Sequence, residues 1–205
     1  MSWIFKAILR HRDIMIGMED WNDMKVKYSV GKVYQYLKKD EPDVGWKHML
    51  SNTIARSITL FTMGMTCHRR LATKVRLKKL GFTTYDRCKF DNKEETIDHL
   101  LFQCPPFKIC WQEILGWMGI QHTPCDWQEE LNWIITQCKG KGWRKCLLRS
   151  SIAETIYKVW KYRNNVVFGN TMNTIEIRDV VIFTLANREW VNTRMRHHIT
   201  NLLID

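Results

Sequence analysis

Residues 88–104 hold the densest group of side chains that could bind a metal ion. Cys88 and Asp91 are separated by two residues, His99 and Cys104 by four, and seven residues lie between the two pairs. Two ligands separated by two residues can meet one side of a tetrahedral ion through a tight turn, and a histidine and a thiolate further along can complete the set. The spacing therefore predicts a zinc site formed by Cys88, Asp91, His99 and Cys104.

Asp91 is the unusual member of this set. Thiolates and imidazoles are good ligands for zinc, whereas a hard carboxylate oxygen is less common beside thiolates. Cys67, His68 or Cys110 could replace Asp91 as the fourth ligand if the fold brought one of them close.

The same residues are compatible with a fold that binds no metal. In that case Cys88 lies in a turn, and His99 and Cys104 lie on a helix beside the apolar residues 100–102. Free cysteine is among the most buried residue types, so a cysteine beside apolar neighbours needs no ligand role. Spacing alone leaves both alternatives open.

Basic residues are concentrated in one part of the chain. The 205 residues carry 32 Lys and Arg against 21 Asp and Glu, a net charge of +11, and residues 44–85 contain no acidic residue. Such a stretch attracts polyanions, because cations that neutralise phosphates release counterions. It predicts a nucleic-acid surface, with the alternative that acids elsewhere in the fold balance a solvated basic face. The predicted phosphate contacts are Arg56, Arg69, Arg70, Lys74, Arg76, Lys78 and Lys79.

The elements that must position these side chains are mostly helices. Apolar residues recur at helical spacing over residues 30–37, 111–118, 127–138 and 148–159. Pro105 and Asp126 are typical starts for the second and third of these helices, and Glu154 falls on the polar side of the fourth. Residues 82–85 and 166–168 are the candidates for short strands. The prediction is a mainly α fold, a compact helical domain with a small zinc-binding turn in the middle.

Five motifs carry a resemblance to a known family. They occur in the family's order and together span about two thirds of the chain. They are residues 28–34 (YSVGKVY), 70–81 (RLATKVRLKKLG), 94–105 (EETIDHLLFQCP), 111–117 (WQEILGW) and 156–164 (IYKVWKYRN). In these motifs the chain resembles the zinc-binding domain found at the C-terminal end of reverse transcriptases from plant LINE-type (non-LTR) retrotransposons.

The resemblance implies a zinc site and a division of the chain. It assigns metal-ligand roles to Cys88, His99 and Cys104, and Asp91 stands where the family has its second cysteine. The expected segments are an N-terminal helical lead-in over residues 1–28, the zinc-binding domain over 29–168 and a C-terminal helix over 169–205. Either the site keeps a carboxylate ligand or it has decayed.

We expect no catalysis. A polymerase needs paired carboxylates for two metal ions, and the sequence contains no Asp-Asp pair. The resemblance implies that the polymerase carboxylates belong to a separate upstream domain. No endonuclease domain is recognised, and the residues after 168 are too few for a ribonuclease H domain. Motifs for a hydrolase nucleophile, a phosphate loop and a metalloprotease are absent as well.

The expected function is therefore a non-catalytic module that binds zinc and, without sequence preference and in a salt-dependent way, RNA or DNA. The alternative is a retroelement-derived protein that binds a protein partner, or a relic without function, with a decayed metal site. No apolar run is long enough for a membrane span. Seven cysteines without a secretory signal indicate a reducing intracellular compartment, nucleus or cytoplasm, and the basic residues 1–12 leave a mitochondrial address open.

Overall fold

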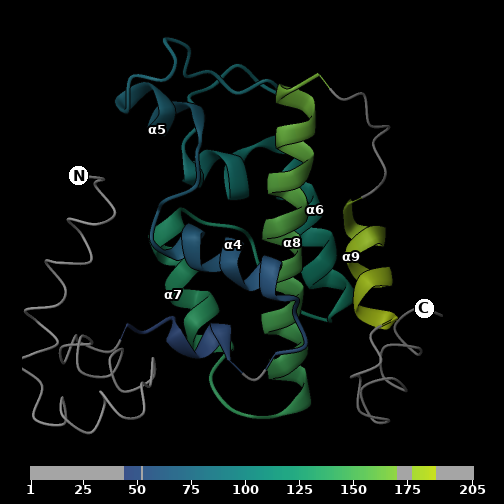
Figure 1. The fold of residues 1–205 in the computed structure, drawn as a ribbon. Coiled ribbons are helices and arrows are strands. Elements are labelled where there is room, and N and C mark those ends of the chain that lie inside the picture. Colours follow the sequence, from purple (N-terminus) through teal and green to yellow (C-terminus); the bar gives the residue numbers. More distant parts are fainter. Residues whose placement is uncertain (1–43, 52, 170–176, 188–205) are drawn as a thin grey trace, which may run out of the picture. The chain divides into compact units, whose positions relative to one another are not determined.

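The computed structural model describes residues 44–51, 53–169 and 177–187 (Figure 1), and all of these except residue 44 belong to one unit of the chain. The predicted lead-in over residues 1–28 and the predicted helix over 30–37 lie outside the described residues. Of the predicted C-terminal segment over residues 169–205, the structure describes residues 169 and 177–187, in which Ile177–Ala186 form a helix.

Helices supply the regular structure of the described residues, which confirms the prediction of a mainly α fold. One of them, η2, is a single π turn, and η1 is a 3-10 turn. The elements in chain order are η1 (Lys47–Leu50), α4 (Ser57–Cys67), α5 (Lys74–Lys79), η2 (His99–Gln103), α6 (Pro105–Trp117), α7 (Trp127–Gln137), α8 (Trp143–Val167) and α9 (Ile177–Ala186).

Neither candidate strand is a strand in the structure. Residues 82–85 are irregular, and Val166 and Val167 are the last residues of α8. Two β-branched residues continue a long packed helix here because tertiary packing overrides their weak local preference. The extended pairing in the described part of the chain is one isolated antiparallel bridge between Arg87 and Glu94.

The starts of α6 and α7 follow the predicted signals. Pro105 is the first residue of α6, where its missing N–H costs no hydrogen bond and its fixed φ suits the helix. Asp126 precedes α7 and accepts hydrogen bonds from the backbone N–H groups of Gln128 and Glu129, at 2.9 and 3.0 Å. Pro105 therefore marks the start of α6, and Asp126 marks the end of the loop that joins α6 to α7.

The longest described helix, α8, contacts α4, α6 and α9 (Figure 1). Its middle section is buried almost all round, including Glu154, which the sequence had placed on a polar face. That prediction was wrong because α4 begins beside Glu154, and Arg56 donates to both carboxylate oxygens at 3.1 and 2.7 Å. No described helix, α8 included, is long and apolar enough to cross a membrane.

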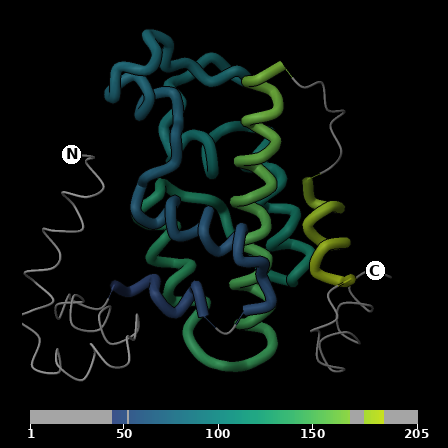
Figure 2. Tube along the Cα trace, viewed as in Figure 1, coloured from purple at the N-terminus to yellow at the C-terminus, as the bar shows by residue number. Residues whose placement is uncertain are grey.

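The segment from α5 to η2 lies at the end of α8 where that helix stops (Figure 2). Phe90 of this segment packs against Phe107 of α6 and Tyr162 of α8, with ring centroids 4.9 and 5.9 Å apart. Behind it, Phe102 of η2 packs against Trp111 and Trp127. The predicted metal ligands therefore belong to a segment that is anchored in the aromatic core.

Candidate metal centre

The first two predicted ligands are held by a tight turn at residues 88–93. The N–H of Cys88 donates to the carbonyl of Lys93 at 2.7 Å, and the N–H of Asn92 donates to the carbonyl of Cys88 at 3.1 Å. Asn92 closes the turn with φ +61°, a left-handed conformation that asparagine tolerates better than most residues. The turn thereby folds Asp91 back toward Cys88.

The other two predicted ligands are joined by a π turn. The N–H of Cys104 donates to the carbonyl of His99 at 2.6 Å, a hydrogen bond between residues five apart. On an α-helix, residues five apart point about 140° away from each other, so a regular helix would separate the imidazole from the thiol. The wider π turn brings them to one side, and π turns of this kind recur at functional sites.

The structure brings the four predicted ligand atoms together. The Sγ atoms of Cys88 and Cys104 are 3.8 Å apart, and Nε2 of His99 lies 3.0 Å from Oδ1 of Asp91. All four ligand atoms lie within 4.8 Å of one another. Cys88, His99 and Cys104 are buried and Asp91 is half-buried. Among the described residues, none of the proposed replacements for Asp91 joins this group.

These residues fit a tetrahedral ion. Two thiolates on a tetrahedral zinc lie about 3.8 Å apart, because each Zn–S bond is about 2.3 Å long. Nε2 of His99 and Oδ2 of Asp91 are buried, and neither has a hydrogen-bond partner among the described residues, since the contact between Nε2 and Oδ1 lacks hydrogen-bond alignment. Leaving two polar atoms buried without partners is unfavourable. A cation bound at this position would satisfy both.

Burial shapes the electrostatics of the two thiols. The pKa of Cys104 is raised well above its usual range, first by desolvation and then by the neighbouring thiol of Cys88. The N–H of Phe90 donates to Sγ of Cys88 at 3.5 Å. Two thiolates 3.8 Å apart repel each other unless a positive charge lies between them.

The sequence analysis did not identify Glu95 and Arg163, which hold the segment that carries the four ligands. Glu95 is fully buried, and one of its oxygens accepts from the N–H of Lys74 at 2.9 Å and from the guanidinium of Arg163. Glu95 and Arg163 both belong to motifs of the family resemblance, and that was the signal that could have identified them as a pair. They tie the start of η2 and the start of α5 to α8.

Two of the predicted phosphate contacts serve the fold itself. Arg56 binds the buried carboxylate of Glu154. Lys74 is buried, its ammonium group donates to the carbonyl of Arg87 at 2.7 Å, and burial lowers its pKa. Both cations therefore form contacts within the domain.

The remaining predicted contacts lie on the outer side of this segment. Arg69 pairs with Asp98 at 2.9 Å, and Lys78 pairs with Asp86 at 2.6 Å. The guanidinium of Arg76 donates to the carbonyl of Arg69 at 2.9 Å. Arg70 and Lys79 are exposed. Arg69 and Arg70 precede α5, whereas Arg76, Lys78 and Lys79 belong to its last turn.

A second group of possible ligands, which the sequence did not suggest, consists of His122, Cys125 and Glu130. Glu130 is fully buried and accepts from Nε1 of Trp111 at 2.9 Å and from the N–H of Cys125 at 3.0 Å, while Nε2 of His122 lies 2.8 Å away. The imidazole stacks on Trp133 with ring centroids 3.7 Å apart. Because this carboxylate is satisfied by protein donors, the group is a hydrogen-bonded junction between α6 and α7.

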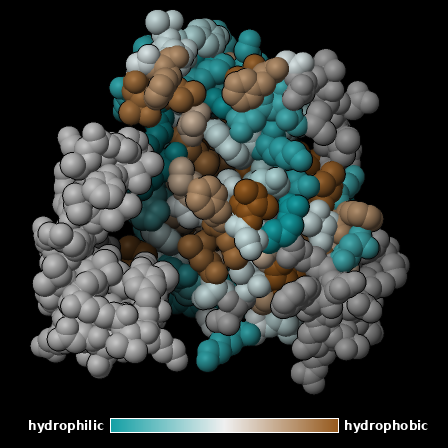
Figure 3. Space-filling view, in the orientation of Figure 1, coloured by the Kyte–Doolittle hydropathy of each residue, from teal (hydrophilic) through white to brown (hydrophobic). Residues whose placement is uncertain are grey.

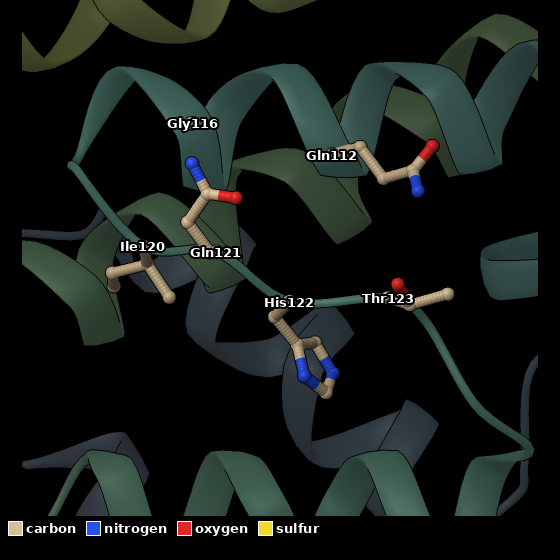
Figure 4. Close-up of a pocket in the computed structure, with 6 residues that line it drawn as sticks. All are labelled: Gln112, Gly116, Ile120, Gln121, His122 and Thr123. Carbon is tan, nitrogen blue, oxygen red and sulfur yellow. The ribbon is translucent and has the colours of Figure 1, made fainter.

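A hollow opens beside this junction, with a volume of about 420 Å³ (Figure 4). His122 and Thr123 line it from the loop, and Gln112 and Gly116 line it from α6. Its walls contain no described cysteine or carboxylate, so the hollow has no connection to the chemistry of the first group.

Comparison with known proteins identifies a similar family. Residues 28–111 match the family model described as zinc-binding in reverse transcriptase. The match includes Cys88, Asp91, His99 and Cys104 and ends within α6, so α7, α8 and α9 lie beyond it. No curated protein and no solved structure matches the chain. The matched family is the zinc-binding part of these enzymes and not their catalytic part. Over residues 28–111 this chain is therefore similar to the zinc-binding domains of reverse transcriptases.

Proposed function

We propose that the chain is a non-catalytic module that binds one zinc ion and, beside it, nucleic acid. The observation that carries the zinc assignment is the convergence of Cys88, Asp91, His99 and Cys104, with two buried polar atoms that lack partners among the described residues. The match of residues 28–111 to a zinc-binding family supports the same assignment.

The proposed ion has a structural role. Four protein ligands leave no open position for water or substrate, which is typical of structural rather than catalytic zinc. When bound, zinc supplies the positive charge that two neighbouring thiolates require and cross-links the turn at residues 88–93 to the π turn at 99–104. Cys88 and Asp91 would hold the ion from the first turn, and His99 and Cys104 would hold it from the second.

Nucleic-acid binding is proposed from charge. Residues 74–93 carry seven Lys and Arg against two Asp, and the stretch before them has no acid back to residue 44. Arg70, Lys79, Lys89 and Lys93 are exposed and can approach phosphates. A surface of this kind binds RNA or DNA without sequence preference and with strong salt dependence. In this proposal the module derives from a LINE-type retrotransposon reverse transcriptase and works in a reducing compartment, nucleus or cytoplasm.

Fluorescence-anisotropy titrations test the binding half of the proposal. A labelled single-stranded RNA and a DNA duplex are each titrated with the full chain at several salt concentrations. We expect the logarithm of the binding constant to fall linearly with the logarithm of salt concentration. Absence of binding to either probe at low salt would reject nucleic-acid binding and favour a protein partner.

A further inference from the structure

Phe82 is held in a fixed position at the end of α5. The N–H of Phe82 donates to the carbonyl of Leu77, and the N–H of Gly81 donates to the carbonyl of Lys78, both at 3.0 Å. Gly81 has φ +77°, the left-handed conformation that this helix ending requires. These two hydrogen bonds form a Schellman motif, so the backbone that carries Phe82 is part of the helix end and not of a free loop.

The ring of Phe82 nevertheless lies in solvent. In a Schellman motif the residue after the glycine usually packs back on the last turn of the helix. Here Phe82 is 77% exposed and its neighbour Leu80 is 55% exposed. Figure 3 shows hydrophobic residues at the surface in the region of α5. An apolar surface held open by a rigid backbone indicates a binding site.

The surroundings of this apolar surface are basic. Lys78 and Lys79 immediately precede it, and both are exposed. Lys is depleted in the cores of protein–protein interfaces, whereas an aromatic ring flanked by cations is what single-stranded nucleic acids require. A duplex keeps its bases stacked inside and cannot offer a free base to a protein ring.

We infer that Phe82, together with Leu80, is a stacking platform for an unpaired base of a single-stranded nucleic acid. Lys79 binds a phosphate beside that base, while the ammonium of Lys78 is paired with Asp86 at 2.6 Å. This inference rests on the proposed nucleic-acid binding and specifies the form of nucleic acid that this end of α5 recognises.

Tyr85 connects the platform to the candidate metal centre. Its hydroxyl donates to Oδ1 of Asn92 at 3.3 Å, and the ammonium of Lys74 lies 4.8 Å from its ring centroid. One face of the Tyr85 ring is therefore already covered by a cation. Tyr85 positions the loop on the turn at residues 88–93, and Phe82 is left to receive the base.

The test compares three variants on two probes. Phe82→Ala removes the ring, Phe82→Tyr retains it, and Phe183→Ala removes a ring that is 69% exposed on α9. The probes are an unstructured single-stranded RNA of about 12 nucleotides and a duplex of the same length. Because Phe82 and Phe183 are both exposed, thermal melting should show all three variants to be folded.

We expect Phe82→Ala to raise the Kd for the single strand by about 5- to 150-fold, the range that loss of one base–aromatic contact produces. The salt slope should stay unchanged, because stacking releases no counterions, and Phe82→Tyr and Phe183→Ala should bind like the wild type. Equal effects of Phe82→Ala and Phe183→Ala would overturn the inference, as would an equal loss on the duplex. Absence of wild-type binding to both probes would instead reject the proposed function on which the inference rests.

Discussion

Arg163 and Glu95 are 68 positions apart in the chain and form a buried ion pair. The side chains are 3% and 0% exposed. Glu95 precedes the π turn that carries His99, and Arg163 lies near the end of α8, beyond the segment that matches the family. The candidate metal centre is therefore held against a helix that lies outside the matched residues.

Arg163→Met should lower the free energy of unfolding by about 3–5 kcal/mol, because it leaves the Glu95 carboxylate buried without its cation. Chemical denaturation followed by circular dichroism measures this loss. The double variant with Glu95→Gln should recover at least about 1 kcal/mol of it, because a neutral amide oxygen can still accept from the N–H of Lys74. A double variant no more stable than Arg163→Met alone would show that the buried charge is not the cause.

Arg56→Ala should destabilise the fold by about 1–3 kcal/mol, because Glu154 is fully buried and loses two hydrogen bonds from the guanidinium. The same change should leave the salt slope of nucleic-acid binding unchanged. Denaturation and anisotropy titrations on one preparation measure both effects. A lower slope without a loss of stability would make Arg56 a phosphate contact instead.

The double variant Arg70→Ala with Lys79→Ala should weaken nucleic-acid binding and leave stability almost unchanged, which is the opposite of Arg56→Ala. Both side chains are exposed, so stability should change little, while the salt slope on a single strand should fall by about 1.4 if both residues bind phosphates. Lys139→Ala with Lys141→Ala is the matched control, because it removes the same charge from exposed positions in the loop between α7 and α8. If the control lowers the slope as much, the nucleic acid does not bind specifically beside α5.

Lys78→Met should raise the pKa of Asp86 toward its ordinary value. In the wild type that pKa is lowered, chiefly by the hydrogen bond from the Lys78 ammonium at 2.6 Å. A carboxylate with a lowered folded-state pKa stabilises the fold above its unfolded-state pKa, and this contribution is lost as the pH falls through the folded-state value. Titration of the Asp86 carboxyl carbon by NMR measures the shift, and an unchanged value in Lys78→Met would show that the pair does not persist in solution.

The helices and the grouping of the four ligands could be predicted from the sequence because both depend on local spacing. Apolar periodicity and a proline or aspartate at a helix start are local signals, and they located α6, α7 and α8. The π turn was not predictable in this way, because the change from a regular helix at His99 depends on what packs around residues 100–102.

The partners of individual basic side chains were harder to predict. Arg56 and Lys74 were counted as surface cations because sequence shows a charge but not its partner. Their partners, Glu154 and the carbonyl of Arg87, come from other parts of the fold. Only the three-dimensional arrangement separates cations that hold the domain together from those that remain available to a ligand.

The most direct test of the central claim is the zinc content of the full chain, measured by mass spectrometry after purification without chelator. We predict one zinc per chain, lost in Cys88→Ser and in Cys104→Ser, retained in Cys67→Ser, and bound more tightly in Asp91→Cys, because a thiolate suits zinc better than a carboxylate. Cys67→Ser is the matched control, since that thiol lies outside the four-residue group. A wild-type chain that is folded and contains no zinc, with Cys88→Ser and Cys104→Ser equally stable, would contradict the account.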